Sequence, residues 1–221
     1  MKPRPDPRTF IAANTRLAPV PGLPAVRLHT AHQATGLWRL AEPAADGSDP
    51  PPPYWAFPWA GGMALARYVL DRPEVVAGRR VLDLGAGSGL VAIAAALAGA
   101  GAIVAADIDP YALAAIDLNA AANGVSLVVT GGDLIAGPPP PVDLVLVGDL
   151  FYERELAARA LAFLDRCAAA GAAVLIGDPR RAYLPLARLR LLAEYAVPDV
   201  GEVEGAAGKP GAVFALVPPA V

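Results

Sequence analysis

Cysteine and histidine are almost absent from this chain of 221 residues, which has one cysteine, Cys167, and two histidines, His29 and His32. A single cysteine excludes an internal disulfide and fits a reducing compartment. The two histidines have no third ligand near them, so we expect no metal site. On a helix, Cys167 would share the apolar face, which favours a buried thiol over the alternative of a nucleophile.

Charged residues are also scarce, at 18% of the chain with a net charge of −3. This balance predicts no general affinity for nucleic acid or for a membrane surface. The longest apolar run, residues 90–106, is too short for a membrane-spanning helix and is interrupted by Gly99 and Gly101. The first residues, MKPRPDPRTF, lack the apolar segment of a signal peptide, and their prolines disfavour a presequence helix. We therefore expect a cytoplasmic protein.

Apolar residues, by contrast, make up 55% of the chain, enough for a sizeable core. Within residues 10–40, the short stretches VRLHT and LWRL predict a small β element. Residues 41–53, AEPAADGSDPPPP, predict a stiff, proline-rich linker. We accordingly divide the chain into the β element with its linker, residues 1–53, and a main domain, residues 54–221, within one globular unit.

Helical and strand patterns alternate regularly through the main domain. Strands are predicted at 79–84, 102–107, 126–130, 142–148 and 172–177, and helices at about 61–71, 90–99, 110–124 and 153–171. Such alternation predicts a parallel sheet with helices on both faces. The C-terminal stretches EYAVPDV and AVFALV predict an antiparallel hairpin at one edge. The expected fold is a Rossmann-like, doubly wound sheet of seven strands, mostly parallel.

A glycine-rich bend, Gly85-Ala-Gly87-Ser-Gly89, follows the first of these strands. Glycines at such a bend let a ligand approach the backbone and let the next helix begin close to the strand. The dinucleotide-binding fingerprint requires a further glycine where this chain has Leu90, which disfavours a dinucleotide oxidoreductase. Asp83 also disfavours it, because a carboxylate beside the loop would repel a pyrophosphate but attract an ammonium group.

Acidic residues stand at the ends of three successive strands, at Asp83, at Asp107 and, just beyond the third strand, at Asp133. S-adenosylmethionine would match all three, with an ammonium for Asp83, ribose hydroxyls for Asp107 and an adenine amino group for Asp133. We expect the neighbouring Ile108 and Leu134 to contribute to the same cofactor site. The alternative is that the three acids only cap the helices that follow them.

Asp149 and Tyr152 stand where the strand VDLVLVG leaves the sheet. Ligands of open α/β sheets bind at the carboxyl ends of the strands, so this pair would lie across the crevice from the glycine loop. We expect Asp149 to attract and orient a target amine, and Tyr152 to hydrogen-bond it or stack on its stem. The alternative is that Asp149 is only the N-cap of the helix that starts near Glu153.

Four aromatic residues, Tyr54, Trp55, Phe57 and Trp59, crowd the segment before the first helix of the main domain. The amphipathic ring of Trp59 suits the wall of a half-wet cofactor pocket. These rings could instead only pack the entry helix against the sheet.

Several of these segments together resemble the seven-strand S-adenosylmethionine-dependent methyltransferases: YWAFPWAGGMALARYVL, VLDLGAGSGLVAIAAALAGA, AADIDPYALAAIDLN, DLVLVGDLFY and VLIGDP. The likeness extends from about Phe10 to Phe214, and PWAGG and GDLFY are its most specific motifs. Within that class the chain is most similar to the protein-lysine methyltransferases that modify the β subunit of electron transfer flavoprotein. The resemblance implies methylation of that protein, with S-adenosylhomocysteine as product. It also implies that Trp59 lies against the cofactor and that Asp149 to Tyr152 line the lysine channel.

Other functions remain open. Ribosomal protein L11 methyltransferases share the core motifs, although this chain is short for that assignment, and another protein or a small amine could be the acceptor. A catalytically silent adenosyl-binding scaffold is the non-enzymatic alternative, against which the intact glycine loop and acid set argue.

Overall fold

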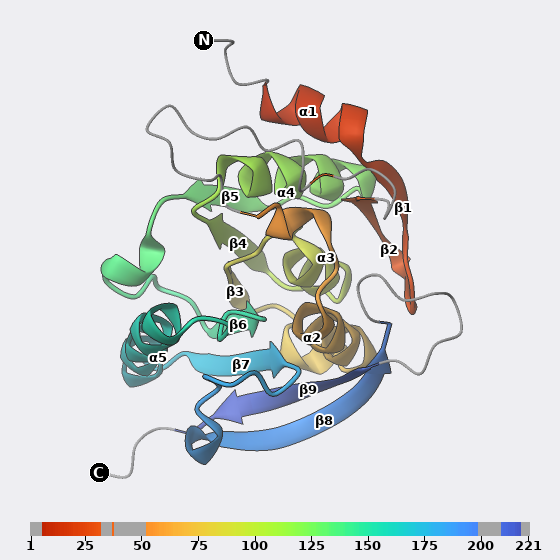
Figure 1. Ribbon diagram of the computed structural model, residues 1–221. Coiled ribbons are helices and arrows are strands. Elements are labelled where there is room, and N and C mark those ends of the chain that lie inside the picture. Colours follow the sequence, from red (N-terminus) through yellow and green to blue (C-terminus); the bar gives the residue numbers. More distant parts are fainter. Residues whose placement is uncertain (1–5, 32–36, 38–51, 199–208, 218–221) are drawn as a thin grey trace.

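The computed structural model describes residues 6–31, 37, 52–198 and 209–217. A seven-stranded sheet in the order β5-β4-β3-β6-β7-β9-β8 forms its centre (Figure 1). The strands are β3 (Arg80–Leu84), β4 (Ala102–Asp107), β5 (Val128–Gly131), β6 (Leu144–Gly148), β7 (Ala173–Asp178), β8 (Leu189–Val197) and β9 (Lys209–Leu216). The first five are parallel to one another, and β9 lies antiparallel between β7 and β8. The predicted fold class is confirmed, although β8 begins earlier than the stretch predicted for it.

Helices cover both faces of the sheet because alternate residues of each buried strand point to opposite sides. On one face, Val81 of β3 shares a core with α2 (Ala60–Asp71), α3 (Leu90–Leu97) and Ile116 of α4 (Pro110–Ala122). On the other face, Leu82 and Leu84 pack with Phe163 of α5 (Arg154–Ala169). Both faces are therefore buried, as the almost continuous apolar strands require.

The N-terminal residues form α1 (Pro7–Asn14) and an antiparallel hairpin of β1 (Arg16–Val20) and β2 (Leu23–Thr30). The VRLHT prediction is confirmed within β2. Of LWRL, only the first residue is among the described residues, and of the predicted linker only the last two are. Helix α1 was not predicted from the sequence; it begins with a proline, at a position where a helix tolerates that residue.

The hairpin packs against the main domain rather than standing apart from it. The backbone N–H of His29 donates to Oδ1 of Asn119 in α4 at 2.7 Å. Leu28 is fully buried in the same core as α2 and α3. These contacts place the β element next to the helices that border the crevice of the sheet.

The surroundings of His29 and Cys167 indicate packing roles and not metal or thiol chemistry. The His29 ring lies 3.1 Å from the hydroxyl of Thr15, and the described residues contain no group of three or more potential metal ligands. Cys167 is buried on the apolar face of α5, as predicted. Burial raises the pKa of its thiol to about 11, so little reactive thiolate exists at neutral pH.

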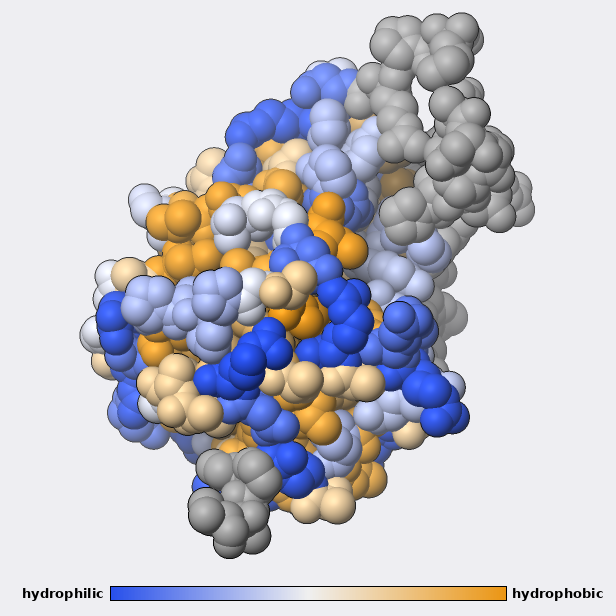
Figure 2. Space-filling model, turned by 90° about the vertical axis from the view of Figure 1, so that its left-hand side faces the viewer, coloured by the Kyte–Doolittle hydropathy of each residue, from blue (hydrophilic) through white to orange (hydrophobic). Residues whose placement is uncertain are grey.

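Hydrophilic and hydrophobic residues are interspersed on the face shown in Figure 2. Throughout the described ranges, no helix is both long enough and apolar enough to cross a membrane.

The strand order reverses between β3 and β6. From β3 the chain continues to β4 and β5 on one side, and it then returns to form β6 on the other side. The loops that leave two such strands diverge and open a crevice at their carboxyl ends. The glycine loop follows β3 and GDLFY follows β6, so the two motifs border the same crevice.

Two glycines bring the N-terminus of α2 unusually close to the sheet. A Cβ atom on Gly177 of β7 would lie 2.1 Å from the carbonyl oxygen of Gly61, a distance that no side chain can occupy. A Cβ atom on Gly61 would lie 2.8 Å from Oδ2 of Asp149. The glycines of PWAGG therefore position the start of α2 directly beside the acid that follows β6.

Candidate active site

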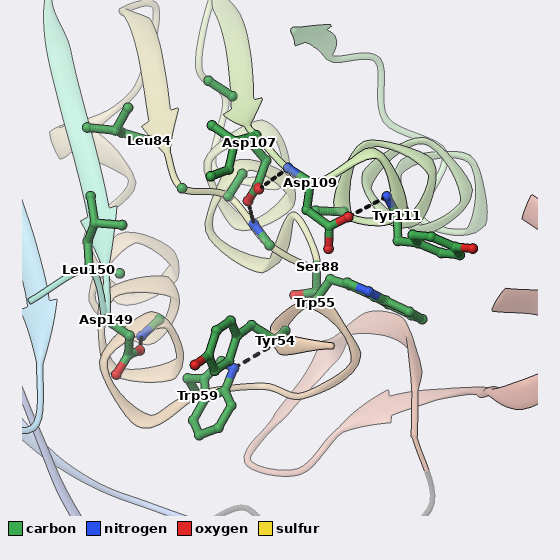
Figure 3. A pocket seen from close by; sticks show the side chains of 18 of the residues that line it. Tyr54, Trp55, Trp59, Leu84, Ser88, Asp107, Asp109, Tyr111, Asp149 and Leu150 are labelled. Carbon is green, nitrogen blue, oxygen red and sulfur yellow. Dashed lines mark hydrogen bonds between the residues drawn. The ribbon is translucent and has the colours of Figure 1, made fainter. Parts of the chain in front are cut away.

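A cavity of about 1810 Å³ lies at the crevice. It is lined by all the residues predicted for the site except one: Trp59, Asp83, Gly85, Gly87, Asp107, Ile108, Asp133, Leu134, Asp149 and Tyr152. Figure 3 shows Asp107 and Asp109 on one side of it, and Asp149, Tyr54 and Trp59 on another. Residues from distant parts of the sequence thus meet around one space.

The three glycines of the loop all have a positive φ, of 69° for Gly85, 54° for Gly87 and 80° for Gly89. Side-chain-bearing residues rarely adopt this conformation, which explains the residue type. Gly89, the predicted site residue that does not line the cavity, is the N-cap of α3. A Cβ atom there would lie 3.3 Å from the side chain of Ile116, so Gly89 permits the close packing of α3 and α4.

Asp107 connects the end of β4 to the glycine loop. Its Oδ2 accepts from the backbone N–H of Gly87 at 2.8 Å, and its Oδ1 accepts from that of Asp109 at 3.0 Å. Asp109 is the N-cap of α4 and accepts from Tyr111 N–H, so Asp107 is not the cap. Since each carboxylate oxygen has a second lone pair, Asp107 can still accept bonds from two hydroxyl groups.

Asp83 is only 1% exposed, at the wall of the cavity behind the loop. Its Oδ2 accepts from the backbone N–H of Ala92, in the first turn of α3, at 2.8 Å. Asp83 therefore accepts a hydrogen bond from the N-terminal turn of α3, as the capping alternative predicted. Burial raises the pKa of this carboxyl to about 7, and the charge of Asp107 adds to the effect. A cation bound nearby would restore the charged form.

Asp133 lies at the same edge of the sheet, after β5. It is the N-cap of a short 3₁₀ helix but makes no side-chain capping bond there. Instead it forms an ion pair with Arg159 of α5, and both side chains are about half exposed. Ile108, 73% exposed, and Leu134 line the cavity and provide apolar surface for a flat ring.

Asp149 has an uncommon backbone conformation for a residue other than glycine, with φ of 57°. Its Oδ2 accepts from Gly62 N–H, at the start of α2, at 2.6 Å, and its Oδ1 accepts from the Arg181 guanidinium at 2.7 Å. The N-cap of α5 is Glu153, so the alternative that Asp149 caps that helix is wrong. Burial raises the pKa of Asp149, although Arg181 and the N–H of Gly62 oppose this rise.

An aromatic cluster of Tyr54, Trp59 and Tyr152 lies at the cavity. The Trp59 indole N–H donates to the carbonyl of Tyr54 at 2.8 Å, and the Tyr54 ring lies 5.9 Å from that of Trp59 and 5.5 Å from that of Tyr152. Tyr152 is 45% exposed, and burial of the rest raises the pKa of its phenol. The cluster offers ring faces at the side of the cavity where Asp149 lies.

Three residues of this region were not predicted from the sequence: Tyr54 as a cavity residue, Asp178 at the end of β7, and Arg181 in the loop that follows. Arg181 lines the cavity and contacts Asp149, while Asp178 is fully buried behind it. The sequence signal for Asp178 and Arg181 was an acid at the end of the fifth parallel strand, in VLIGDP, with an arginine three residues later.

Three comparisons with known proteins agree with this geometry. The family model described as ribosomal protein L11 methyltransferase (PrmA) matches residues 64–146. The solved ribosomal protein L11 methylase from Lactobacillus delbrueckii subsp. bulgaricus matches 73% of this chain and 81% of its own, with a TM-score of 0.51 and 22% identity. The Pyrococcus abyssi tRNA (uracil-54, C5)-methyltransferase in complex with S-adenosyl-L-homocysteine matches 71% of this chain and 38% of its own, with a TM-score of 0.53 and 19% identity.

The fold is thus that of the Rossmann-like methyltransferases among these solved structures. The electron transfer flavoprotein beta subunit lysine methyltransferase of Xenopus laevis is 40% identical over 199 residues, which are 87% of this chain and 80% of that protein. This chain belongs to that family of protein-lysine methyltransferases.

Proposed function

We propose that this chain transfers methyl groups from S-adenosylmethionine to lysine side chains of the electron transfer flavoprotein β subunit. The observation that carries the proposal is the shared cavity. It joins the glycine loop and Asp107, which suit an adenosyl cofactor, to Asp149 and the aromatic cluster, which suit a lysine side chain.

The donor groups of the cavity fit the cofactor. Asp107 has acceptor capacity for ribose hydroxyls, and Asp83 lies where an ammonium group would favour its charged form. The glycine loop lets a ligand approach its backbone. The cavity of about 1810 Å³ also exceeds the roughly 300–1,000 Å³ of a pocket for one small ligand, which leaves room for an acceptor side chain.

When bound, S-adenosylmethionine supplies an electrophilic methyl group on a sulfonium. A lysine amine has a pKa of about 10.4 in water and therefore arrives as an ammonium. The Asp149 carboxylate attracts that ammonium, and the ring faces of the aromatic cluster pack against the lysine stem. The low exposure of Asp149 and the positive sulfonium of the bound cofactor would both disfavour a second positive charge, so the ammonium would give its proton to solvent and become the neutral amine that can accept a methyl group. Asp149 then orients the amine.

The test is to incubate the purified protein with the electron transfer flavoprotein β subunit and S-adenosylmethionine carrying a labelled methyl group. Label should appear on the β subunit, and mass spectrometry of its peptides should assign whole methyl groups to lysines. The Asp149→Asn variant serves as the matched negative control. A β subunit that stays unlabelled with active enzyme would overturn the substrate assignment.

Ribosomal protein L11 is the second candidate substrate, because the L11 methyltransferase family model matches residues 64–146. Those residues contain the glycine loop and Asp107 but end before Asp149 and Tyr152. The match therefore concerns the cofactor half of the cavity. Supplying L11 in a parallel reaction distinguishes the two substrates.

A further inference from the structure

Both carboxylate oxygens of Asp149 already accept a hydrogen bond in the free protein. One oxygen accepts from the N–H of Gly62 at 2.6 Å, and the other is paired with the Arg181 guanidinium at 2.7 Å. The Asp149 side chain is 9% exposed, while that of Arg181 is 28% exposed. Arg181 thus already neutralises Asp149 and holds one of the two oxygens to which a lysine ammonium would bind.

A second acid lies within reach of the same guanidinium. Asp178 Oδ1 accepts from the backbone N–H of Arg181 at 2.6 Å. Its Oδ2 lies 3.8 Å from Arg181 Nε, and these two buried atoms have no hydrogen-bond partner among the described residues. Buried polar atoms without partners are costly, so a small shift of the guanidinium toward Asp178 would satisfy both of them.

The charges of the three residues do not balance. Asp149 and Asp178 carry two negative charges when ionised, and Arg181 carries one positive charge. Burial raises the pKa of Asp178 to about 6, with the charge of Asp149 adding to the rise, so at neutral pH Asp178 is mostly charged without full compensation. One further cation, such as a lysine ammonium, would neutralise the group.

We propose that Arg181 holds the ammonium position on Asp149 in the free enzyme and moves to Asp178 when the target lysine binds. This inference rests on the proposed lysine methylation. Arg181 and Asp178 are then positioning residues for the acceptor. The pairing also gives specificity, because only a cationic acceptor takes the place of the guanidinium without leaving Asp149 uncompensated.

Two substitutions separate this exchange from a static structural role. Arg181→Gln frees Asp149 permanently, so the KM for the substrate protein should fall by roughly tenfold, the scale of one charge-assisted hydrogen bond. Its kcat should fall too, because no guanidinium is left to compensate Asp178, and the added net negative charge holds the lysine as an ammonium. Asp178→Asn keeps the bond from Arg181 N–H but removes the charge that receives the guanidinium. Its KM should therefore rise by roughly tenfold.

The double variant tests whether Asp178 acts through Arg181. Its KM should equal that of Arg181→Gln alone, since no guanidinium is left to move. Arg180→Gln is the matched control, because Arg180 is the adjacent arginine and pairs with Glu194 at the exposed surface. That control should leave the KM unchanged. If Arg181→Gln and Asp178→Asn both raise the KM, and do so additively, the exchange is refuted.

A readout without turnover keeps this inference distinct from the substrate assignment. The Arg181 Nε–H resonance can be followed by ¹⁵N NMR in the complex with S-adenosylhomocysteine, using n-butylammonium as a probe for the lysine side chain. The resonance should shift on addition of the probe in the parent protein and not in Asp178→Asn. A shift without methylation of the β subunit would overturn only the substrate. Methylation without a shift would overturn the exchange.

Discussion

Replacing Asp83 by asparagine should stabilise the protein and weaken its cofactor binding at the same time. Asp83 is 1% exposed, and burial raises its pKa from 3.8 to about 7. Asparagine has nearly the same shape, and its amide oxygen can still accept from the N–H of Ala92. The substitution therefore removes a buried charge while it keeps the hydrogen bond to α3.

The size and the pH dependence of the gain follow from this pKa. Below the unfolded-state pKa of about 4 the carboxyl is neutral in both states, so Asp83 carries no cost there. As the pH rises toward 7, Asp83 ionises in the unfolded chain but stays largely protonated in the folded protein, so the free energy of unfolding falls. Three pKa units at about 1.4 kcal/mol each set an upper limit of about 4 kcal/mol. The advantage of Asp83→Asn should be near zero at pH 4 and about 2–4 kcal/mol at pH 8.

Urea denaturation without cofactor, at both pH values, measures the stability, and calorimetry measures the affinity for S-adenosylmethionine. The affinity should fall by roughly tenfold, because the cofactor's ammonium loses a charged acceptor. Asp117→Asn is the control, since Asp117 is exposed and pairs with Arg8 at the surface. A stability gain that does not change with pH would refute the claim that burial raises the pKa of Asp83. An unchanged affinity for S-adenosylmethionine would show that Asp83 does not belong to the cofactor site.

Three further predictions concern the cavity and its frame. Asp107→Ala should weaken S-adenosylmethionine binding by about ten- to a hundredfold, measured by calorimetry, because the ribose hydroxyls lose a charged acceptor. Asp149→Asn should leave that affinity unchanged but cut the methylation rate by about a hundredfold or more, and a parental rate would show that Asp149 is scaffold. Gly177→Ala should cost about 3 kcal/mol or more in urea denaturation, since its Cβ would overlap the carbonyl of Gly61, and a stable variant would contradict the close packing.

The pattern along the chain was sufficient to predict the sheet and the edge that carries the site. Alternating apolar strands and helices allow few arrangements other than a doubly wound sheet, and the carboxyl ends of parallel strands share one edge. Asp83, Asp107, Asp133 and Asp149 each lie at or just after the end of a strand, so their presence around one cavity could be inferred without a structure. Each of these inferences uses only periodicity and nearest neighbours in the sequence.

The partners of those acids depended on the tertiary structure. The bond from Gly62 to Asp149 spans 87 positions, and the bond from Arg181 to Asp149 spans 32. No local pattern signals either contact, because each is produced by the packing of α2 and the loop after β7 against the end of β6. The burial that raises the pKa values of Asp83 and Asp178 could not be predicted from the sequence either. The desolvation of a carboxyl depends on all the atoms that surround it, and only the folded chain brings those atoms together.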